Sequence, residues 1–484
     1  MSKAKNSSNN YQIYSLFFLS AIIVRIVFHW LTNYTFDDAY ITFRYAENIA
    51  NGLGFVYNAG EKLLGTTTPL FTLLLAGLNV IGIPVATSAL LISLIASGLT
   101  AVIVYRFANV IGFSNFSFIP VIVYIFFPRL LAIDTAGMET ALFTFLVTSA
   151  FYLQYKKYHL QAIGITSLSV LVRPEGLLVL AILFLYDLFY QRSGLLKSIL
   201  VSVIILLPWV IFAILYFGSV IPHSMTAKMV FYEHVWSSPA LDNFIFVMGW
   251  HNLFGIVLSI LAAIGCWYLI IKFRYGVIEL FWIIATIVAL TFSSTLVFRW
   301  YIAPIYPIYI LFASATLLFL LEKFKSIELS TKQSRIFIGT CLVAALLLAN
   351  YPNVKNYQNE WNILHTIHND IVSYLVKYAN ANDVVCTEDI GYVGYYIDNK
   401  ILDRVGLVSE VSVFYNRERA YADLILDQKP RWLIISPSDP TADILSDEVF
   451  KKLYEKKQKF TYTGLTEWEF EIWEYKIKKI MDYR

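Results

Sequence analysis

The stretch YQIYSLFFLSAIIVRIVFHWL, residues Tyr11–Leu31, is an apolar run with a single arginine. A helix needs about 20 consecutive apolar residues to cross the hydrocarbon core of a membrane. This run is long enough. It follows the basic residues Lys3 and Lys5, and no small-residue cleavage site comes after it. The stretch therefore predicts an uncleaved first transmembrane helix rather than a signal peptide.

The composition of the whole chain supports a membrane protein. Of its 484 residues 58% are hydrophobic and only 15% are charged, whereas a typical soluble domain has roughly 25% charged residues. The net charge is +3, and the basic residues cluster beside apolar segments, so we expect no nucleic-acid partner. Three scattered cysteines are too few for a disulfide framework or a zinc site.

Twelve apolar runs are candidates for membrane helices, because backbone amides in lipid must be satisfied within their own element. They cover residues 11–32, 67–83, 86–112, 115–133, 139–156, 160–172, 175–190, 196–217, 252–272, 277–297, 301–321 and 335–351. Lys and Arg favour cytoplasmic ends. Asp38 and Glu139 can then both lie outside only if an even number of spans separates them, yet three runs lie between.

The shortest of these three, residues 67–83, begins TTTPL and ends GIP, and we interpret it as an interfacial or re-entrant helix. We predict an α-helical polytopic protein with eleven spans and a cytoplasmic N-terminus. Residues 1–351 form the membrane domain, with an outer loop at 33–66. Charged residues become dense after Pro352, so residues 352–484 are predicted to be a soluble, extracytoplasmic α/β domain.

Within this C-terminal part, helical patterns alternate with short apolar strands. We expect helices at His365–Tyr378 and Arg417–Gln428. The expected strands are Asp383–Glu388, Lys400–Gly406, Arg431–Ser436, Lys459–Thr463 and Glu469–Tyr475.

The outer loop contains two adjacent carboxylates, in the sequence TFDDAYITFRYAENIANGLGF (Thr35–Phe55). We expect Thr35 to cap a short helix that ends at Asn51-Gly52. Their spacing of three and four places Asp37, Tyr40, Arg44 and Glu47 on one face of that helix. One Asp suffices for capping and two like charges repel, so the pair favours a functional role.

Further ionisable residues punctuate the apolar sequence on the predicted outer side. Each has a structural explanation by itself, such as an ion pair at the start of a helix. Ionisable groups near lipid are costly, however, and usually line a cavity. We therefore expect a common cavity for Asp134, Glu139, Arg173, Glu175, His223, Lys228 and Arg299.

Paired carboxylates and several cations at an outer membrane surface suit one chemistry in particular. A lipid-linked sugar phosphate needs its phosphate held by Arg, Lys or His, and an acceptor hydroxyl needs a carboxylate as general base. The leaving group is already a phosphate. No phosphate-cradling glycine loop is found in the sequence, and none is required.

The segments that carry these residues resemble the bacterial GT-C glycosyltransferases related to the mycobacterial terminal arabinofuranosyltransferase. They are DDAYITFRYAENIANGLGFVYNAGE, GMETALF, LVRPEG, PHSMTAK, FRWYIAPIYP and, near the end, EDIGYVGYYIDNKILDRVGL. The resemblance spans nearly the whole chain. It implies a GT-C fold and an inverting transfer from a polyprenyl-phosphate sugar to a glycan or glycolipid acceptor, at the outer face of a bacterial inner membrane.

The resemblance also implies roles for individual residues. A carboxylate of the first outer loop acts as base, which is Asp38 or Asp37, with Asp38 slightly favoured. The donor-phosphate and substrate-binding candidates are Arg44, Tyr40, Arg173, His223, Lys228 and Arg299, and Glu139 and Glu175 are candidates for contacting the acceptor. Some relatives use a divalent cation such as Mg, Mn or Ca, although two adjacent Asp without a His partner are weak evidence for a metal.

Other readings stay open at this point. A transporter or flippase of lipid-linked sugars would also want outer charges and apolar grooves, but no inverted repeats or mid-membrane charges favour it. An oligosaccharide ligase should rely on a large outer loop. A non-catalytic scaffold is a third alternative. The glycine-aromatic segment GYVGYY suits a packing unit, or alternatively an acceptor-docking loop.

Overall fold

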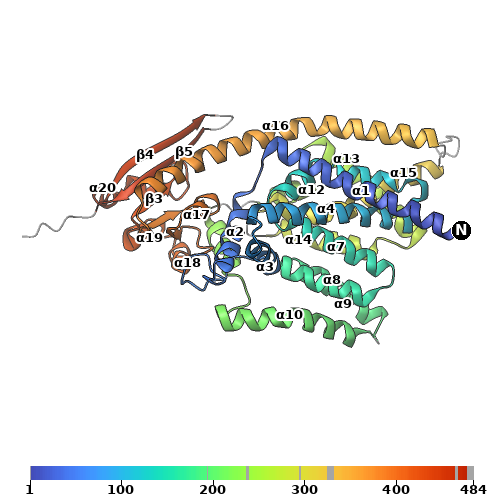
Figure 1. The fold of residues 1–484 in the computed structure, drawn as a ribbon, viewed down its shortest axis with the longest axis horizontal. Helices are drawn as coiled ribbons and strands as arrows, with labels where there is room; N and C mark the ends of the chain where they lie inside the picture. Colours follow the sequence, from blue (N-terminus) through green and yellow to red (C-terminus); the bar gives the residue numbers. More distant parts are fainter. Residues whose placement is uncertain are drawn as a thin grey trace, which may run out of the picture.

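The computed structural model describes residues 2–192, 194–235, 239–293, 296–323, 332–463 and 467–476. A long helical body carries a small α/β domain at one end (Figure 1). The α-helices of the body are α1 (Ser2–Thr32), α2 (Asp37–Ala50), α3 (Pro69–Val80), α4 (Val85–Val110), α5 (Phe118–Ile125), α6 (Pro128–Thr135), α7 (Thr140–Tyr155), α8 (His159–Val172), α9 (Gly176–Tyr190), α10 (Leu195–Phe217), α11 (His223–Val235), α12 (Ala240–Met248), α13 (Leu253–Phe273), α14 (Val277–Thr291), α15 (Tyr306–Lys323) and α16 (Lys332–Tyr378), joined by the 3-10 turns η1 (Ser114–Phe116), η2 (Arg299–Tyr301) and η3 (Ala303–Ile305).

Within the described residues, six helices are long and apolar enough to cross a membrane, and a seventh candidate is the pair α5/α6, bent by 57°. Four shorter apolar helices accompany them. The chain is a multi-pass membrane protein. Each of the eleven predicted spans coincides with a helix or with the bent pair. Whether every one of these helices crosses the membrane stays a prediction. The twelfth run forms α3, whose 12 residues extend only about 18 Å.

A buried ion pair fixes the packing of α1 against α6. The Nη2 of Arg25 lies 2.7 Å from the Oδ2 of Asp134, and the two side chains are 0% and 1% exposed. Ser97 of α4 donates a hydrogen bond to the same carboxylate oxygen. Asp134, which the sequence grouped with the outer ionisable residues, therefore lies inside the helical packing and outside any cavity of the site described below.

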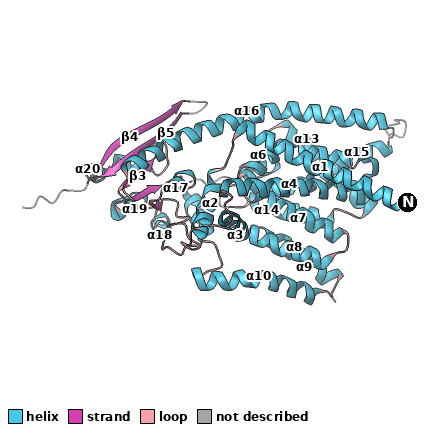
Figure 2. Ribbon diagram, viewed as in Figure 1, coloured by secondary structure: helices cyan, strands magenta, loops and turns pink. Residues whose placement is uncertain are grey.

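The C-terminal part is a five-stranded mixed sheet, drawn in magenta in Figure 2. The strand order is β2-β1-β3-β5-β4, with β1 parallel to β2 and β3, and β5 antiparallel to β3 and β4. Its elements are β1 (Val384–Thr387), α17 (Tyr392–Tyr396), β2 (Lys400–Asp403), α18 (Glu410–Arg417), α19 (Tyr421–Gln428), β3 (Trp432–Ile435), η4 (Ala442–Ser446), α20 (Glu448–Leu453), β4 (Tyr454–Thr463) and β5 (Glu467–Tyr475). All five predicted strands are confirmed, and β4 begins five residues earlier than predicted, at Tyr454 rather than Lys459.

Helix α16 joins the body to this sheet. It runs for 47 residues and continues through Pro352, so the predicted domain boundary lies inside one helix. In Figure 1 it extends along the whole body and reaches the strands.

Helix α2 lies between the body and the C-terminal part (Figure 1). The predicted cap by Thr35 is wrong: the N-cap residue is Phe36, and its side chain forms no capping hydrogen bond. The predicted stop is confirmed, since Asn51 is the C-cap and Gly52 has a φ of 78°, a left-handed conformation that glycine adopts without strain.

Candidate active site

A cavity of about 450 Å³ opens where α2, α11 and the loop before α3 meet. It is lined by Asp38, Ile41, Thr42, Gly65, Thr66, Thr67, Thr68, Met138, Glu139, Arg173, Ser224, Met225, Lys228, Met229, Phe292, Ser293, Trp300, Tyr301 and Leu407. Leu407 belongs to the C-terminal part, so both parts of the chain build this space. We call it the Asp38 cavity.

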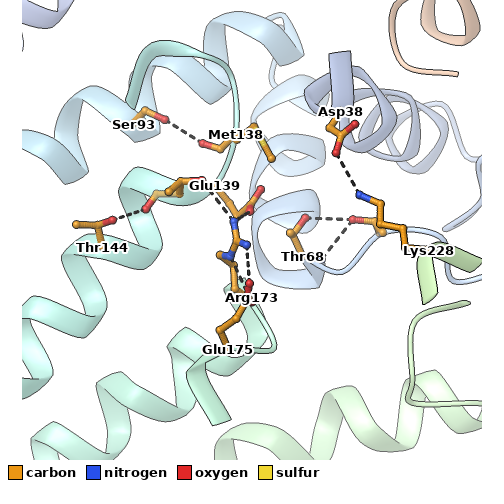
Figure 3. Close-up of polar contacts among 11 residues, drawn as sticks. Asp38, Thr68, Ser93, Met138, Glu139, Thr144, Arg173, Glu175 and Lys228 are labelled. Atoms are coloured by element: carbon orange, nitrogen blue, oxygen red, sulfur yellow. Dashed lines mark hydrogen bonds and ion pairs between the residues drawn. The ribbon is translucent and has the colours of Figure 1, made fainter. Parts of the chain in front are cut away.

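Asp38 faces Lys228 across this cavity (Figure 3). The Nζ of Lys228 donates a hydrogen bond of 3.3 Å to the Oδ2 of Asp38, and the Asp38 side chain is 34% exposed. Asp38 lies in the first turn of α2, where the helix dipole favours a negative charge. The carboxylate is thus fixed near a cation and stays accessible from the cavity.

Lys228 is largely buried and keeps its charge. Burial alone would lower the pKa of its ammonium group, but the Asp38 carboxylate and the hydroxyls of Tyr301 and Tyr232 raise it. Its Nζ also lies 5.3 Å from the centre of the Phe298 ring, a cation–π distance. The cavity therefore contains a permanent positive charge.

Arg173 occupies the opposite wall, between two carboxylates (Figure 3). Its Nη1 lies 2.9 Å from the Oε1 of Glu139, and its Nη2 lies 2.6 Å from the Oε1 of Glu175. The guanidinium also faces the Tyr301 ring at 5.2 Å. Two carboxylates neutralise this arginine, so its main effect is to hold Glu139 at the cavity and to tie the start of α7 to the start of α9.

Three threonines complete the wall at the start of α3. The Oγ1 atoms of Thr66 and Thr68 lie 3.1 Å apart, and the Thr68 amide donates to Thr66 at 3.3 Å. Pro69 is the first residue of α3, a position that suits proline because its missing N–H would be unpaired there. We did not predict these hydroxyls as site residues. The sequence feature that could have revealed them is the run of three threonines directly before Pro69, the first residue of α3.

Helices α3, α7 and α11 all begin at this cavity, because residues of their first turns or N-caps line it. The N-terminus of a helix carries a partial positive charge of about half a unit. Together with Lys228, these ends favour an anionic group in the cavity.

Asp37 points to a different partner. Its Oδ2 accepts the Gly391 amide at 3.0 Å, and its Oδ1 accepts the Tyr392 amide at 2.7 Å, at the start of α17. A side chain at Gly391 would overlap the Asp37 carboxylate, so only glycine allows this approach. Burial raises the pKa of Asp37 to about 6. Asp37 thus holds the C-terminal part against α2.

The predicted polar face of α2 exists, and the C-terminal part covers it. Tyr40 packs against the rings of Tyr392 and Tyr395. Arg44 donates to the carbonyls of Tyr57 at 2.9 Å and Asn399 at 3.0 Å, and also to that of Gly394. Tyr40 and Arg44 are therefore not brought into the cavity.

Two other predicted residues also lie outside the cavity lining. His223 precedes the lining residue Ser224, and its backbone amide donates to the Leu64 carbonyl at 2.8 Å. Arg299 lies on the far side of η2 and lines a second cavity. Of the ten predicted site residues, the structure brings together Asp38, Glu139, Arg173 and Lys228, with Glu175 held beside them through Arg173.

Among the described residues, no group of three or more His, Cys, Asp and Glu side chains could hold a metal ion. The carboxylates at the cavity wall are already paired with cations, Asp38 with Lys228 and Glu139 with Arg173. This donor set does not fit a divalent cation.

Comparison with solved structures shows that the fold is similar to that of the membrane protein ArnT. ArnT from Cupriavidus metallidurans, in the structure bound to undecaprenyl phosphate, aligns with a TM-score of 0.58 at 12% identity, covering 95% of this chain and 97% of the ArnT chain. The apo structure of the same protein also aligns at 0.58, covering 96% and 98%. Residues 352–474 match a family model described as a domain of unknown function (DUF8728). No curated protein sequence matches the chain.

Proposed function

We propose that this chain is a membrane glycosyltransferase that moves a sugar from a polyprenyl-phosphate donor to a hydroxyl of a glycan or glycolipid acceptor, on the outer face of a cell membrane. Asp38 is the general base. The observation that carries the proposal is the contact between Asp38 and Lys228 inside the cavity, since a carboxylate beside a cation is the pair needed to deprotonate a hydroxyl and to bind a phosphate.

The fold and the cavity support a lipid-linked donor. A GT-C relative in fold, ArnT, has been crystallised with undecaprenyl phosphate. The cavity of this chain offers Lys228, the three threonine hydroxyls and several helix N-termini to a phosphate. Its Met138, Met225 and Met229 provide an apolar surface, and flexible methionines adapt to irregular ligands.

Transfer would proceed by exchange of charge partners. Without donor, Lys228 neutralises Asp38. A bound donor phosphate attracts the ammonium group, and this frees the Asp38 carboxylate. Asp38 then accepts the proton of the acceptor hydroxyl. At the same time the oxygen of that hydroxyl bonds to the anomeric carbon of the donor sugar. The bond between that carbon and the phosphate oxygen breaks, its electron pair stays on the phosphate, and Lys228 stabilises the charge. Attack opposite the phosphate inverts the anomeric carbon.

The roles of the neighbouring residues follow from their pairing. Glu139, held by Arg173 at 2.9 Å, lies at the cavity wall, where its carboxylate would accept hydrogen bonds from sugar hydroxyls. Arg173 acts as a positioning residue. The transferred sugar is left open between arabinofuranose, a hexose and another sugar, and the acceptor is a glycan or glycolipid of the cell envelope.

The decisive test is transfer by purified Asp38→Asn protein with a polyprenyl-phosphate sugar and a glycan acceptor. Removing a general base should lower the turnover number by about 100- to 10,000-fold, with donor binding retained. Asp37→Asn is the matched control, because it makes the same chemical change one residue away, outside the cavity. It should keep turnover within about tenfold of the parent. Full activity of Asp38→Asn would reject the assignment.

A transporter of lipid-linked sugars is the competing function. Reconstituted vesicles separate the two, because a transporter moves labelled lipid between leaflets without forming a glycosidic bond. We expect a glycosylated acceptor, absent when the donor is omitted.

A further inference from the structure

A second cavity of about 450 Å³ lies on the other side of η2. Arg299 of η2 faces this second cavity, whereas the next two residues, Trp300 and Tyr301, line the Asp38 cavity. Its polar wall contains Arg129 from the start of α6, His251 from the link before α13, and residues of α16 that include Glu360. We call it the Arg129 cavity.

Positive charge in the Arg129 cavity is only partly compensated. The Nη1 of Arg129 donates to the Tyr306 hydroxyl at 2.9 Å, and its Nη2 lies 3.2 Å from the Nε2 of His251. Neither partner is a carboxylate, and in the described part of the chain Arg129 forms no ion pair with Asp or Glu. An arginine held by neutral partners keeps its charge available for a ligand.

Glu360 is the one carboxylate among the described lining residues, and its shorter contact is to Tyr34 rather than to an arginine. The Oε2 of Glu360 lies 4.0 Å from the Nη1 of Arg299, at the outer limit of an ion pair. Its Oε1 accepts a hydrogen bond of 2.7 Å from the hydroxyl of Tyr34. The second arginine therefore has a weak, distant counter-charge, and more than half of its side chain is exposed.

The excess of positive charge also affects the pKa of His251. Its pKa is lowered by partial burial and by the charges of Arg129 and Arg299. The N-termini of α6 and α13 add positive potential to the cavity. Arg129 lies in the first turn of α6 and Asn252 is the N-cap of α13, and both residues line the cavity. The cavity therefore attracts an anion with several acceptor oxygens, such as a phosphate.

The surroundings indicate that the anion belongs to a lipid. Directly after His251 and Asn252, α13 exposes Leu253, Phe254 and Val257, and it is one of the helices able to span a membrane. A narrow apolar cleft between α13, α14 and α15 shares Arg129 and Tyr306 with the cavity. Charged groups directly above lipid-facing residues lie at the depth of the headgroups.

We infer that the Arg129 cavity binds the phosphate of a lipid headgroup, with Arg129 and Arg299 contacting its oxygens from two sides. This site goes beyond the proposed transfer reaction and does not depend on it. A lipid held there lies beside the Asp38 cavity, separated from it by η2.

The test uses the full chain in detergent, with native mass spectrometry of bound phosphatidic acid as readout. Phosphatidylcholine, whose phosphate is screened by a cation, and inorganic phosphate are the comparison ligands. We expect Arg299→Gln to weaken phosphatidic acid binding about tenfold and Arg129→Gln/Arg299→Gln to weaken it about a hundredfold, since each substitution removes one charge-assisted hydrogen bond. Arg417→Gln, an exposed arginine on α18, should bind like the parent.

The outcomes separate the alternatives. Binding by the double variant at parental strength would overturn the inference. So would a loss that appears in Lys228→Gln instead, because the lipid phosphate would then occupy the Asp38 cavity, an outcome that leaves the proposed function intact. Inorganic phosphate that competes at equal concentration would assign the site to free phosphate. Because Arg299 is exposed, Arg299→Gln should keep the parental melting temperature, so weakened binding in that variant cannot be ascribed to unfolding.

Discussion

The Nζ of Lys228 lies 3.3 Å from the Oδ2 of Asp38, although the two residues are 190 positions apart in the chain. This contact joins α2, the short helix after α1, to α11 across the Asp38 cavity. It brings together two of the segments that carry the family resemblance. It also brings together the general base and the phosphate-stabilising cation of the proposed transfer.

Lys228→Gln should lower the affinity for a polyprenyl-phosphate donor about tenfold, because one charge-assisted contact to the phosphate is lost. Lys228→Arg keeps the charge and should retain more of the affinity. Donor binding to the purified variants, measured by lipid titration, checks this. Lys62→Gln is the control, since Lys62 lies over the Tyr216 ring and outside the cavity. Equal losses in the two glutamine variants would contradict the assignment.

Attachment of the C-terminal part to α2 should weaken as pH rises from about 4 to 6. Burial raises the pKa of Asp37 from 3.8 to about 6, so the folded chain keeps this proton at a pH where the unfolded chain has lost it. The stabilising effect of that proton is complete at low pH and disappears as the pH passes the folded pKa. Nearby His368 and Asp389 contribute to this environment.

The rate of limited proteolysis within the C-terminal part measures this attachment. Asp37→Asn carries no titrating group at this position and should show a flatter pH profile than the parent. An identical slope in both proteins would contradict the role given to Asp37.

Arg44→Gln should destabilise the contact between α2 and the C-terminal part by about 2 to 3 kcal/mol. The guanidinium donates to backbone carbonyls of Tyr57, Ile397 and Asn399, and these would lose a charged donor. Thermal melting is the measurement. Donor affinity should stay within about threefold of the parent. A loss of donor binding without destabilisation would mean that Arg44 binds the substrate.

Arg25→Met should destabilise the helical body by about 3 to 5 kcal/mol, because it leaves the buried Asp134 carboxylate without its partner. Arg25→Met/Asp134→Leu should recover most of this loss, since no unpaired charge remains. Melting temperatures of the two variants in the same detergent give the comparison. Equal destabilisation in both would mean that the pair contributes through packing alone.

Much of this architecture could be predicted from the sequence, for reasons visible in particular segments. The run Tyr11–Leu31 is apolar throughout, and apolarity over that length has few outcomes other than a membrane helix. The short strand-like runs before Glu388 and Ser436 became β1 and β3. The spacing in α2 correctly placed Asp37, Tyr40 and Arg44 on one face.

The partner of that face could not be predicted. A helical face rich in polar groups can meet water, a substrate or another part of the protein, and the pattern is the same in each case. Only the fold brings Gly391 and Tyr392, more than 350 residues away in the chain, against Asp37. The Arg129 cavity could not be predicted from the sequence either, because its two arginines, Arg129 and Arg299, lie far apart in the chain.

The sequence by itself determined a multi-pass helical protein with an α/β end and an acidic pair on a short helix after the first span. Only the tertiary structure decided that Asp37 binds the C-terminal part and that Asp38 faces the cavity. The physical reason is the helix itself, in which neighbouring side chains point about 100° apart. Two adjacent carboxylates therefore meet different surroundings, and long-range packing selects which one lines the Asp38 cavity.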